Sequence, residues 1–264
     1  MIHIQMIQAL LLALLAADLH FVILGDRTGE TQPGIYEQVW KETAAENPAF
    51  VVSVGDTIQG LDDKTADREW REVQRILPPR IKLYLTPGNH DIWSDLSESL
   101  FRKYSGHAPH YSFDYDQAHF TILDNSRDDQ FSAAELAWLE SDLREHEKQP
   151  VKFVFSHRPS WLIEILLKNP QSAIHQIAKK YRVQYVISGH VHQMIHSNFE
   201  GITYLSMPSA GGHLRGTMKY EDGWFFAHTL VDVSGTEVRF QIKELKNRVT
   251  TPSNWGASGL LHHE

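Results

Sequence analysis

Short apolar runs alternate with amphipathic segments through the first two thirds of the chain. The runs are rich in β-branched and aromatic residues and have the length of buried strands. Between them, apolar residues recur at helical spacing, as Trp70, Val73 and Leu77 do. This alternation favours right-handed crossovers and a mainly parallel central sheet. The predicted strands are residues 19–24, 50–54, 81–85, 119–123, 151–155 and 183–188, and further helical faces carry Leu136, Leu139 and Leu143, and Ile174, Ile177 and Tyr181.

The helical spacing stops after about residue 193. Four consecutive antiparallel strands are predicted there, at residues 194–199, 202–207, 223–233 and 236–245. We therefore expect a second sheet that packs on the first, with helices outside, in an α/β domain that spans residues 18–248. Residues 249–264 contain Pro252, Gly256 and Gly259 and are expected to form a loosely ordered tail.

The N-terminal segment resembles a secretory signal peptide. Residues 9–17 are apolar and end in small residues, as at a cleavage site, although residues 1–8 contain no Lys or Arg. The run is shorter than the about 20 apolar residues of a membrane span. We expect residues 1–17 to be a signal peptide and the protein to be exported to the periplasm or outside the cell. The alternative is an amphipathic helix at the start of a cytoplasmic protein.

Composition excludes several kinds of chemistry. The 264 residues include no cysteine, so disulfides, thiolate metal sites and cysteine nucleophiles are ruled out. The formal net charge is −8, and no basic run stands out, which disfavours stable binding to a nucleic-acid backbone. The 16 histidines are unusually many, so their positions are informative.

Candidate metal ligands follow five of the predicted strands. They lie in Gly25-Asp26, Gly55-Asp56, Gly88-Asn89-His90-Asp91, Ser156-His157 and Gly189-His190-Val191-His192. The carboxyl ends of strands in an open α/β sheet line one crevice, so these side chains should converge. Oxygen and imidazole ligands without thiolate suit Mn²⁺, Zn²⁺ or Fe. A single aspartate after a strand is explained by its frequent role in turns, but that role does not explain why histidines follow several strands.

In this order, the motifs resemble those of calcineurin-like metallophosphoesterases over roughly residues 19–245. The resemblance implies a four-layer α/β/β/α sandwich of two mixed sheets flanked by helices, with a two-metal centre between the sheet ends. It implies that Asp56 bridges two divalent ions. It further implies that Asp26 and His192 complete the first site and that Asn89, His157 and His190 complete the second.

The same resemblance implies a hydrolase that cleaves phosphate mono- or diesters, on a small molecule or a protein, with a hydroxide that bridges two Mn, Fe or Zn ions. His90 would bind a phosphate oxygen or protonate the leaving group, and Asp91 would orient the His90 ring. Substrate-binding candidates are Arg27, Asn89 and His90, with a surface salt bridge as the alternative for Arg27. The loop at residues 126–129 and a helix at residues 94–106 are possible walls of the crevice.

One motif departs from the family pattern. The usual Asp-x-His is Asp26-Arg27-Thr28 in this chain, so a threonine stands where a histidine ligand is expected. Because a hydroxyl is a poor ligand for a transition metal, the first site is expected to use water or Mg²⁺, or to recruit another side chain, with His213 as a candidate. Thr28 simply capping its loop is the plainest alternative.

Two other functions remain as alternatives. A binding module that keeps the fold but has little or no activity is supported by Thr28 and opposed by the presence of His90 and Asp91. A nucleotide-binding loop at residues 25–29 is disfavoured, because it lacks the lysine of a P-loop and the G-x-G-x-x-G spacing. Trp161 is expected to pack inside the protein, although stacking on an aryl substrate is an alternative.

Overall fold

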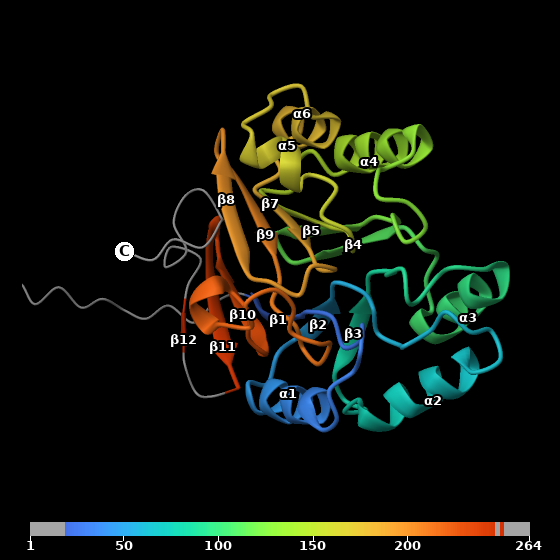
Figure 1. Cartoon of the computed structure of the whole chain (residues 1–264). Helices are drawn as coiled ribbons and strands as arrows, with labels where there is room; N and C mark the ends of the chain where they lie inside the picture. Colours follow the sequence, from blue (N-terminus) through green and yellow to red (C-terminus); the bar gives the residue numbers. More distant parts are fainter. Residues whose placement is uncertain (1–18, 246–248, 251–264) are drawn as a thin grey trace, which may run out of the picture.

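Two six-stranded sheets form the centre of the protein, for which the computed structural model describes residues 19–245 and 249–250 (Figure 1). Sheet A has the order β12-β11-β10-β1-β2-β3, and sheet B has the order β4-β5-β6-β7-β9-β8. The strands of sheet A are β1 (Leu19–Leu24), β2 (Phe50–Ser53), β3 (Lys82–Leu85), β10 (Ala227–Ser234), β11 (Glu237–Glu244) and β12 (Val249–Thr250). Those of sheet B are β4 (Tyr111–Tyr115), β5 (Ala118–Ile122), β6 (Val151–Phe155), β7 (Tyr185–Ser188), β8 (Ile195–Phe199) and β9 (Ile202–Ser206).

Helices cover the outer face of each sheet, which gives the expected four layers (Figure 1). Trp40 and Trp70, from the helices on sheet A, belong to one apolar cluster with strand residues such as Val51. Leu139 and Ile174, from the helices on sheet B, belong to another. Sheet A carries α1 (Ile35–Ala45), α2 (Ala66–Ile76) and α3 (Asp95–Ser105), and sheet B carries α4 (Ala133–Glu145), α5 (Leu162–Leu166) and α6 (Ala173–Lys180).

Aromatic side chains fill the space between the two sheets. The rings of Phe21 and Phe50 from sheet A are stacked at 5.1 Å, as are those of Phe120 and Phe153 from sheet B at 5.0 Å. Phe21 meets Phe120 edge to face at 5.2 Å, so the contact crosses from one sheet to the other. This packing fixes the sheets face to face, with their loops at a shared edge.

The division of strands between the sheets differs from the sequence-based expectation. A mainly parallel central sheet and a separate sheet after residue 193 are both wrong: β8 and β9 extend sheet B, whereas β10 and β11 extend sheet A. β1 lies between β2, which is parallel to it, and β10, which is antiparallel. Because β1 is almost entirely buried, its backbone needs hydrogen-bond partners along both edges, and β10 supplies the second edge.

α1 and β4 are among the elements that were not predicted. α1 carries Tyr36, Val39, Trp40 and Thr43 on its buried face, and this helical spacing was readable in the sequence. β4 is an edge strand whose last two residues are exposed, so it has no continuous apolar run.

The ends of the chain only partly fall within the described residues. The predicted signal peptide, residues 1–17, lies outside them. The first two residues of the predicted tail, Val249–Thr250, form β12 and pair with β11, so sheet A extends past the expected domain boundary at residue 248. No helix in the described ranges is both long enough and apolar enough to cross a membrane.

Candidate metal centre

All six predicted metal ligands lie at one edge of the sandwich. Asp26 and Asp56 directly follow β1 and β2, and Asn89 follows β3, all in sheet A. The three histidines follow β6 and β7 of sheet B, so the two sheets share the site. They are His157, His190 and His192.

The ligand atoms form two groups that share Asp56. In the first group, single oxygen or nitrogen atoms of Asp26, Asp56 and His192 lie within 4.8 Å of one another, and all three residues are buried. In the second group, single atoms of Asp56, His157 and His190 also lie within 4.8 Å of one another; Asp56 and His157 are buried, and His190 is half-buried. Asp56 is thus the residue that the two groups have in common.

Asn89 belongs to the second group by its distances. The Nε2 atom of His157 lies 3.1 Å from Oδ1 of Asn89, 3.2 Å from Oδ1 of Asp56 and 3.2 Å from Nδ1 of His190. Four potential donor atoms therefore face one point. This mixed oxygen and imidazole set, without sulfur, suits a divalent ion such as Mn²⁺, Fe²⁺ or Zn²⁺.

Backbone carbonyls fix the ring orientation of two of the histidines. Nδ1 of His157 donates to the carbonyl of Val54 (2.9 Å), and Nδ1 of His192 donates to the carbonyl of His213 (2.7 Å). Each bond occupies Nδ1, so Nε2 is the ring nitrogen left to face the ligand group, as in metal-binding histidines.

Unpartnered polar atoms support the fit to a cation. Oδ2 of Asp26 and Nε2 of His192 are buried and have no hydrogen-bond partner within the described residues. Such atoms are costly unless a ligand occupies them. The backbone of the loops is also strained. Asp56, His190 and His192 have φ angles of 54°, 69° and 60°, which residues other than glycine rarely adopt. Strain of this kind persists where the surrounding structure holds it for a function.

Burial and mutual charge shift the pKa values of the group. Burial raises the pKa of Asp26. Burial also opposes ionisation of Asp56, but the charge on His157 outweighs it and holds the pKa of Asp56 well below its usual range. In turn, Asp56 overcomes the effect of burial on His157 and raises the pKa of His157 to about 9. Burial, together with the charge of His157, lowers the pKa of His190 to about 4.

The prediction that Asp91 orients the His90 ring is wrong. The ring Nδ1 of His90 instead donates to the backbone carbonyl of Gln59, 2.5 Å away. Oδ1 of Asp91 accepts the N–H groups of Thr57 (2.9 Å) and Ile58 (3.2 Å), and its Oδ2 accepts the N–H group of Gly88 (2.9 Å). Asp91 thus joins the loop that carries Asp56 to the turn that carries Asn89. A carboxylate is suited to this task because it only accepts hydrogen bonds, and buried N–H groups need acceptors.

The first group contains no side chain that replaces the expected histidine. Thr28 is fully buried, and its hydroxyl bonds to Gln59 and to Thr31 of its own loop. His213 contributes its backbone carbonyl to His192, whereas its imidazole belongs to none of the three groups of potential metal ligands among the described residues. The expectation that His213 supplies a replacement imidazole is therefore not supported.

Two other predicted residues are engaged inside the protein. The guanidinium of Arg27 lies over the ring of Tyr36 at 5.5 Å and donates to the carbonyl of Thr57 (3.1 Å). These contacts give Arg27 a structural role in place of the predicted surface salt bridge, and a contact with substrate stays a prediction. Trp161 is fully buried and donates to Oγ of Ser188 (3.0 Å), which confirms that it packs inside.

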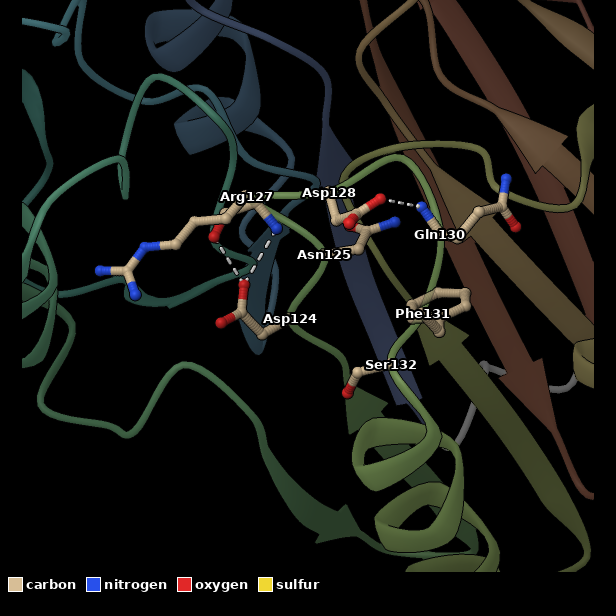
Figure 2. A pocket seen from close by; sticks show the side chains of 8 residues that line it. Asp124, Asn125, Arg127, Asp128, Gln130, Phe131 and Ser132 are labelled. Carbon is tan, nitrogen blue, oxygen red and sulfur yellow. Dashed lines mark hydrogen bonds between the residues drawn. The ribbon is translucent and has the colours of Figure 1, made fainter.

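A polar pocket of about 240 Å³ lies beside the His157 loop (Figure 2). Asn125 connects the pocket to the His157 loop. Its Oδ1 accepts the N–H of Arg158 (3.1 Å), and its Nδ2 donates to the carbonyl of Arg158 (2.8 Å). Three of the four residues of the possible wall at 126–129 line this pocket, as Figure 2 shows for Arg127 and Asp128. The lining residues are Asp124, Asn125, Ser126, Arg127, Asp128, Gln130, Phe131 and Ser132.

Three residues around the centre were not predicted from the sequence, namely Gln59, Asn125 and Arg215. Gln59 contacts both His90 and Thr28. The guanidinium of Arg215 borders the space beside Gly29, next to the ring of His192. Arg215 comes from the loop before β10, and no motif or periodicity marks it.

The fold and this double ligand group agree with the family that the sequence motifs resemble. A family model described as "Calcineurin-like phosphoesterase" matches residues 12–194, more than half of the chain, so the protein belongs to that family.

Among curated proteins, the chain is similar to cyclic nucleotide phosphodiesterases. It is 27% identical over 159 residues to a 3',5'-cyclic-nucleotide phosphodiesterase of Nostoc sp., which covers 56% of this chain and 59% of that protein. It is 25% identical over 205 residues to the 3',5'-cyclic adenosine monophosphate phosphodiesterase CpdA of Escherichia coli. That match covers 74% of this chain and 72% of CpdA. The chain thus matches less than two thirds of the Nostoc protein's length.

Among solved structures, the fold is similar to that of a purple acid phosphatase from yellow lupin seeds. The TM-score is 0.65 at 15% sequence identity, and the match covers 88% of this chain and 52% of that chain. At this identity, the likeness supports the fold alone.

Proposed function

We propose that this protein is a two-metal phosphodiesterase that hydrolyses small-molecule esters of the 3',5'-cyclic nucleotide type. The observation that carries the proposal is the pair of ligand groups that share Asp56. The substrate class is supported by the similarity to the Nostoc and Escherichia coli enzymes.

In this proposal, Asp26, Asp56 and His192 hold one ion, and Asp56, Asn89, His157 and His190 hold the other. Two divalent ions bound there would supply positive charge to the phosphoryl oxygens and lower the pKa of a coordinated water. The N–H of His90 donates to Oδ1 of Asp56 (2.9 Å), so the turn that bears His90 is fixed to the shared carboxylate.

His90 is the proposed proton donor to the leaving alkoxide. Its Nδ1–H is engaged by the carbonyl of Gln59, so Nε2 is the ring atom left to face the ester. The neighbouring pocket at residues 124–132 offers polar groups and Phe131 for the organic part of the substrate.

The test is a panel of 3',5'-cyclic AMP, bis-p-nitrophenyl phosphate and p-nitrophenyl phosphate, each assayed with Mn²⁺, Fe²⁺, Zn²⁺ and Mg²⁺. We expect turnover of the two diesters and two bound ions per chain. Asp56→Asn should abolish turnover, because it weakens both ion sites at once. A protein that binds metal but turns over none of the three esters would support the binding module instead, and activity on the monoester alone would refute the diester assignment.

A further inference from the structure

The hydroxyl of Thr28 is committed to other side chains. It accepts a hydrogen bond from Oγ1 of Thr31 (3.2 Å) and donates its single proton to Oε1 of Gln59 (2.5 Å). Thr28 is fully buried, so no water competes for these bonds. The residue that departs from the family pattern therefore holds the carboxamide of Gln59 in place.

Gln59 connects Thr28 to His90. It lies three residues after Asp56, on the same loop, and its side chain is exposed although that of Thr28 is buried. Its backbone carbonyl accepts Nδ1–H of His90, and its side-chain Oε1 accepts the hydroxyl of Thr28. Gln59 thus links Thr28 to the proposed proton donor.

The amide nitrogen of Gln59 remains available. Nε2 makes no hydrogen bond to any residue in the described ranges, whereas Oε1 is already satisfied. With Oε1 fixed by Thr28, the two N–H donors point away from that bond. An anion bound at the ligand groups, flanked by His90, is the partner that such donors fit.

We infer that Gln59 is a substrate-binding residue whose Nε2 donates to an oxygen of the phosphoryl group, and that Thr28 is the residue that positions it. The inference rests on the proposed function for the identity of the substrate, but it concerns binding of phosphate rather than turnover. It also assigns a role to Thr28 that does not involve a metal ion.

The experiment compares Gln59→Ala, Thr28→Val and the double variant in the protein loaded with Mn²⁺. Calorimetry measures the affinity for Mn²⁺ and for inorganic phosphate, and kinetics on bis-p-nitrophenyl phosphate separate KM from kcat. Thr28→Val keeps the shape of the side chain and removes its hydroxyl, and Thr28→Ser restores the hydroxyl. Gln38→Ala, an exposed glutamine on α1, is the matched control.

We expect Gln59→Ala to weaken phosphate binding by about tenfold and to raise KM more than it lowers kcat. Thr28→Val should give a similar loss, the double variant should be no worse than Gln59→Ala, and Thr28→Ser should recover most of the affinity. Mn²⁺ affinity should stay within twofold in all of them.

Two outcomes overturn the inference. Weaker Mn²⁺ binding in Thr28→Val would make the hydroxyl a metal ligand, and unchanged phosphate affinity in Gln59→Ala would remove the proposed contact. Because phosphate binding is measured without turnover, failure of the inference is distinguishable from an inactive wild-type protein.

Discussion

Nδ1 of His157 donates to the backbone carbonyl of Val54, 2.9 Å away, and this bond joins the two sheets. His157 follows β6 in sheet B, whereas Val54 follows β2 in sheet A. The orientation of a candidate ligand from one sheet is therefore fixed by the backbone of the other. Any change in how the sheets pack alters the ligand group itself.

Removal of metal should lower stability as well as activity. Because the proposed ligands come from both sheets, bound ions would link them, and ions that bind only the folded state stabilise it. At a free concentration of about 100 times the Kd, one ion contributes about 2.7 kcal/mol. We expect chelation with EDTA to lower the Tm measured by circular dichroism, and Mn²⁺ to restore it. An equal Tm with and without metal would contradict this prediction.

His90→Asn should lower turnover while the protein stays folded and binds metal normally. Loss of a general acid costs roughly 10²-fold or more. The loss should be larger for cyclic AMP, which has a poor alkoxide leaving group, than for bis-p-nitrophenyl phosphate, whose leaving group needs little protonation. An equal loss for both substrates would contradict the role of proton donor, and loss of metal would assign His90 to metal binding.

Asp91→Ala should destabilise the protein and weaken metal binding together. It leaves three buried N–H groups, on Thr57, Ile58 and Gly88, without their acceptor. The expected loss is at least about 2 kcal/mol in the free energy of unfolding, measured in urea. Asp91→Asn keeps Oδ1 and should show a smaller loss. Normal stability of the alanine variant would show that these bonds contribute little.

Gly29→Ala should weaken metal binding selectively at the first group. A Cβ atom there would lie 2.9 Å from Cε1 and 3.2 Å from Nε2 of His192, so the ring must move. Gly34→Ala is a matched control, because Gly34 has φ +79° against +80° at Gly29 but no atom within 4 Å of a Cβ. In both variants the free energy of unfolding should fall by about 1 kcal/mol, because alanine disfavours the left-handed backbone conformation. Only Gly29→Ala should weaken one of two Mn²⁺ equivalents in a titration, and equal affinities in the two variants would contradict the prediction.

His228 should make stability depend on pH. It is 1% exposed on β10, and burial lowers its pKa despite the nearby carboxylates of Glu42 and Glu46. As the pH falls below about 6.5, the unfolded chain binds a proton at this residue that the folded protein does not, so stability decreases. His228→Leu removes this contribution. With metal saturating, the Tm of the wild type should fall relative to that of the variant between pH 7.5 and 5, whereas a constant difference would refute the assignment.

The strands were largely predictable, but their arrangement was not. Runs such as residues 151–155 are buried along their whole length in β6, and burial leaves a clear apolar pattern. The pairing of β10 with β1 joins segments about 200 residues apart, and no local pattern encodes such a contact. β4 was missed because an edge strand exposed at one end has a weaker pattern.

The candidate ligands could be located from the sequence because each follows a strand, and strand ends meet at one edge. The residues that hold these ligands in place could not be located from the sequence. Asp91 bonds to backbone N–H groups, and Gln59 bonds through its own carbonyl, so neither contact requires a particular motif. The presence of Thr28 was visible, but its partner Gln59 lies 31 positions away and became evident only in three dimensions.

The hairpin turns at Glu200-Gly201 and Ser234-Gly235 lie at the far end of their strands from the metal centre. β9 is parallel to β7, and the carboxyl end of β7 leads to His190, so β9 begins at the end of the sheet that is distant from the metal centre. β10 is antiparallel to β1, and the carboxyl end of β1 leads to Asp26, so β10 ends at that same distant end. Gly201 and Gly235 have no atom within 4 Å of a Cβ position. A fluorescent label or a surface tether attached at either turn would therefore leave the mouth of the centre facing solution, which makes these turns suitable anchor points for immobilising the protein.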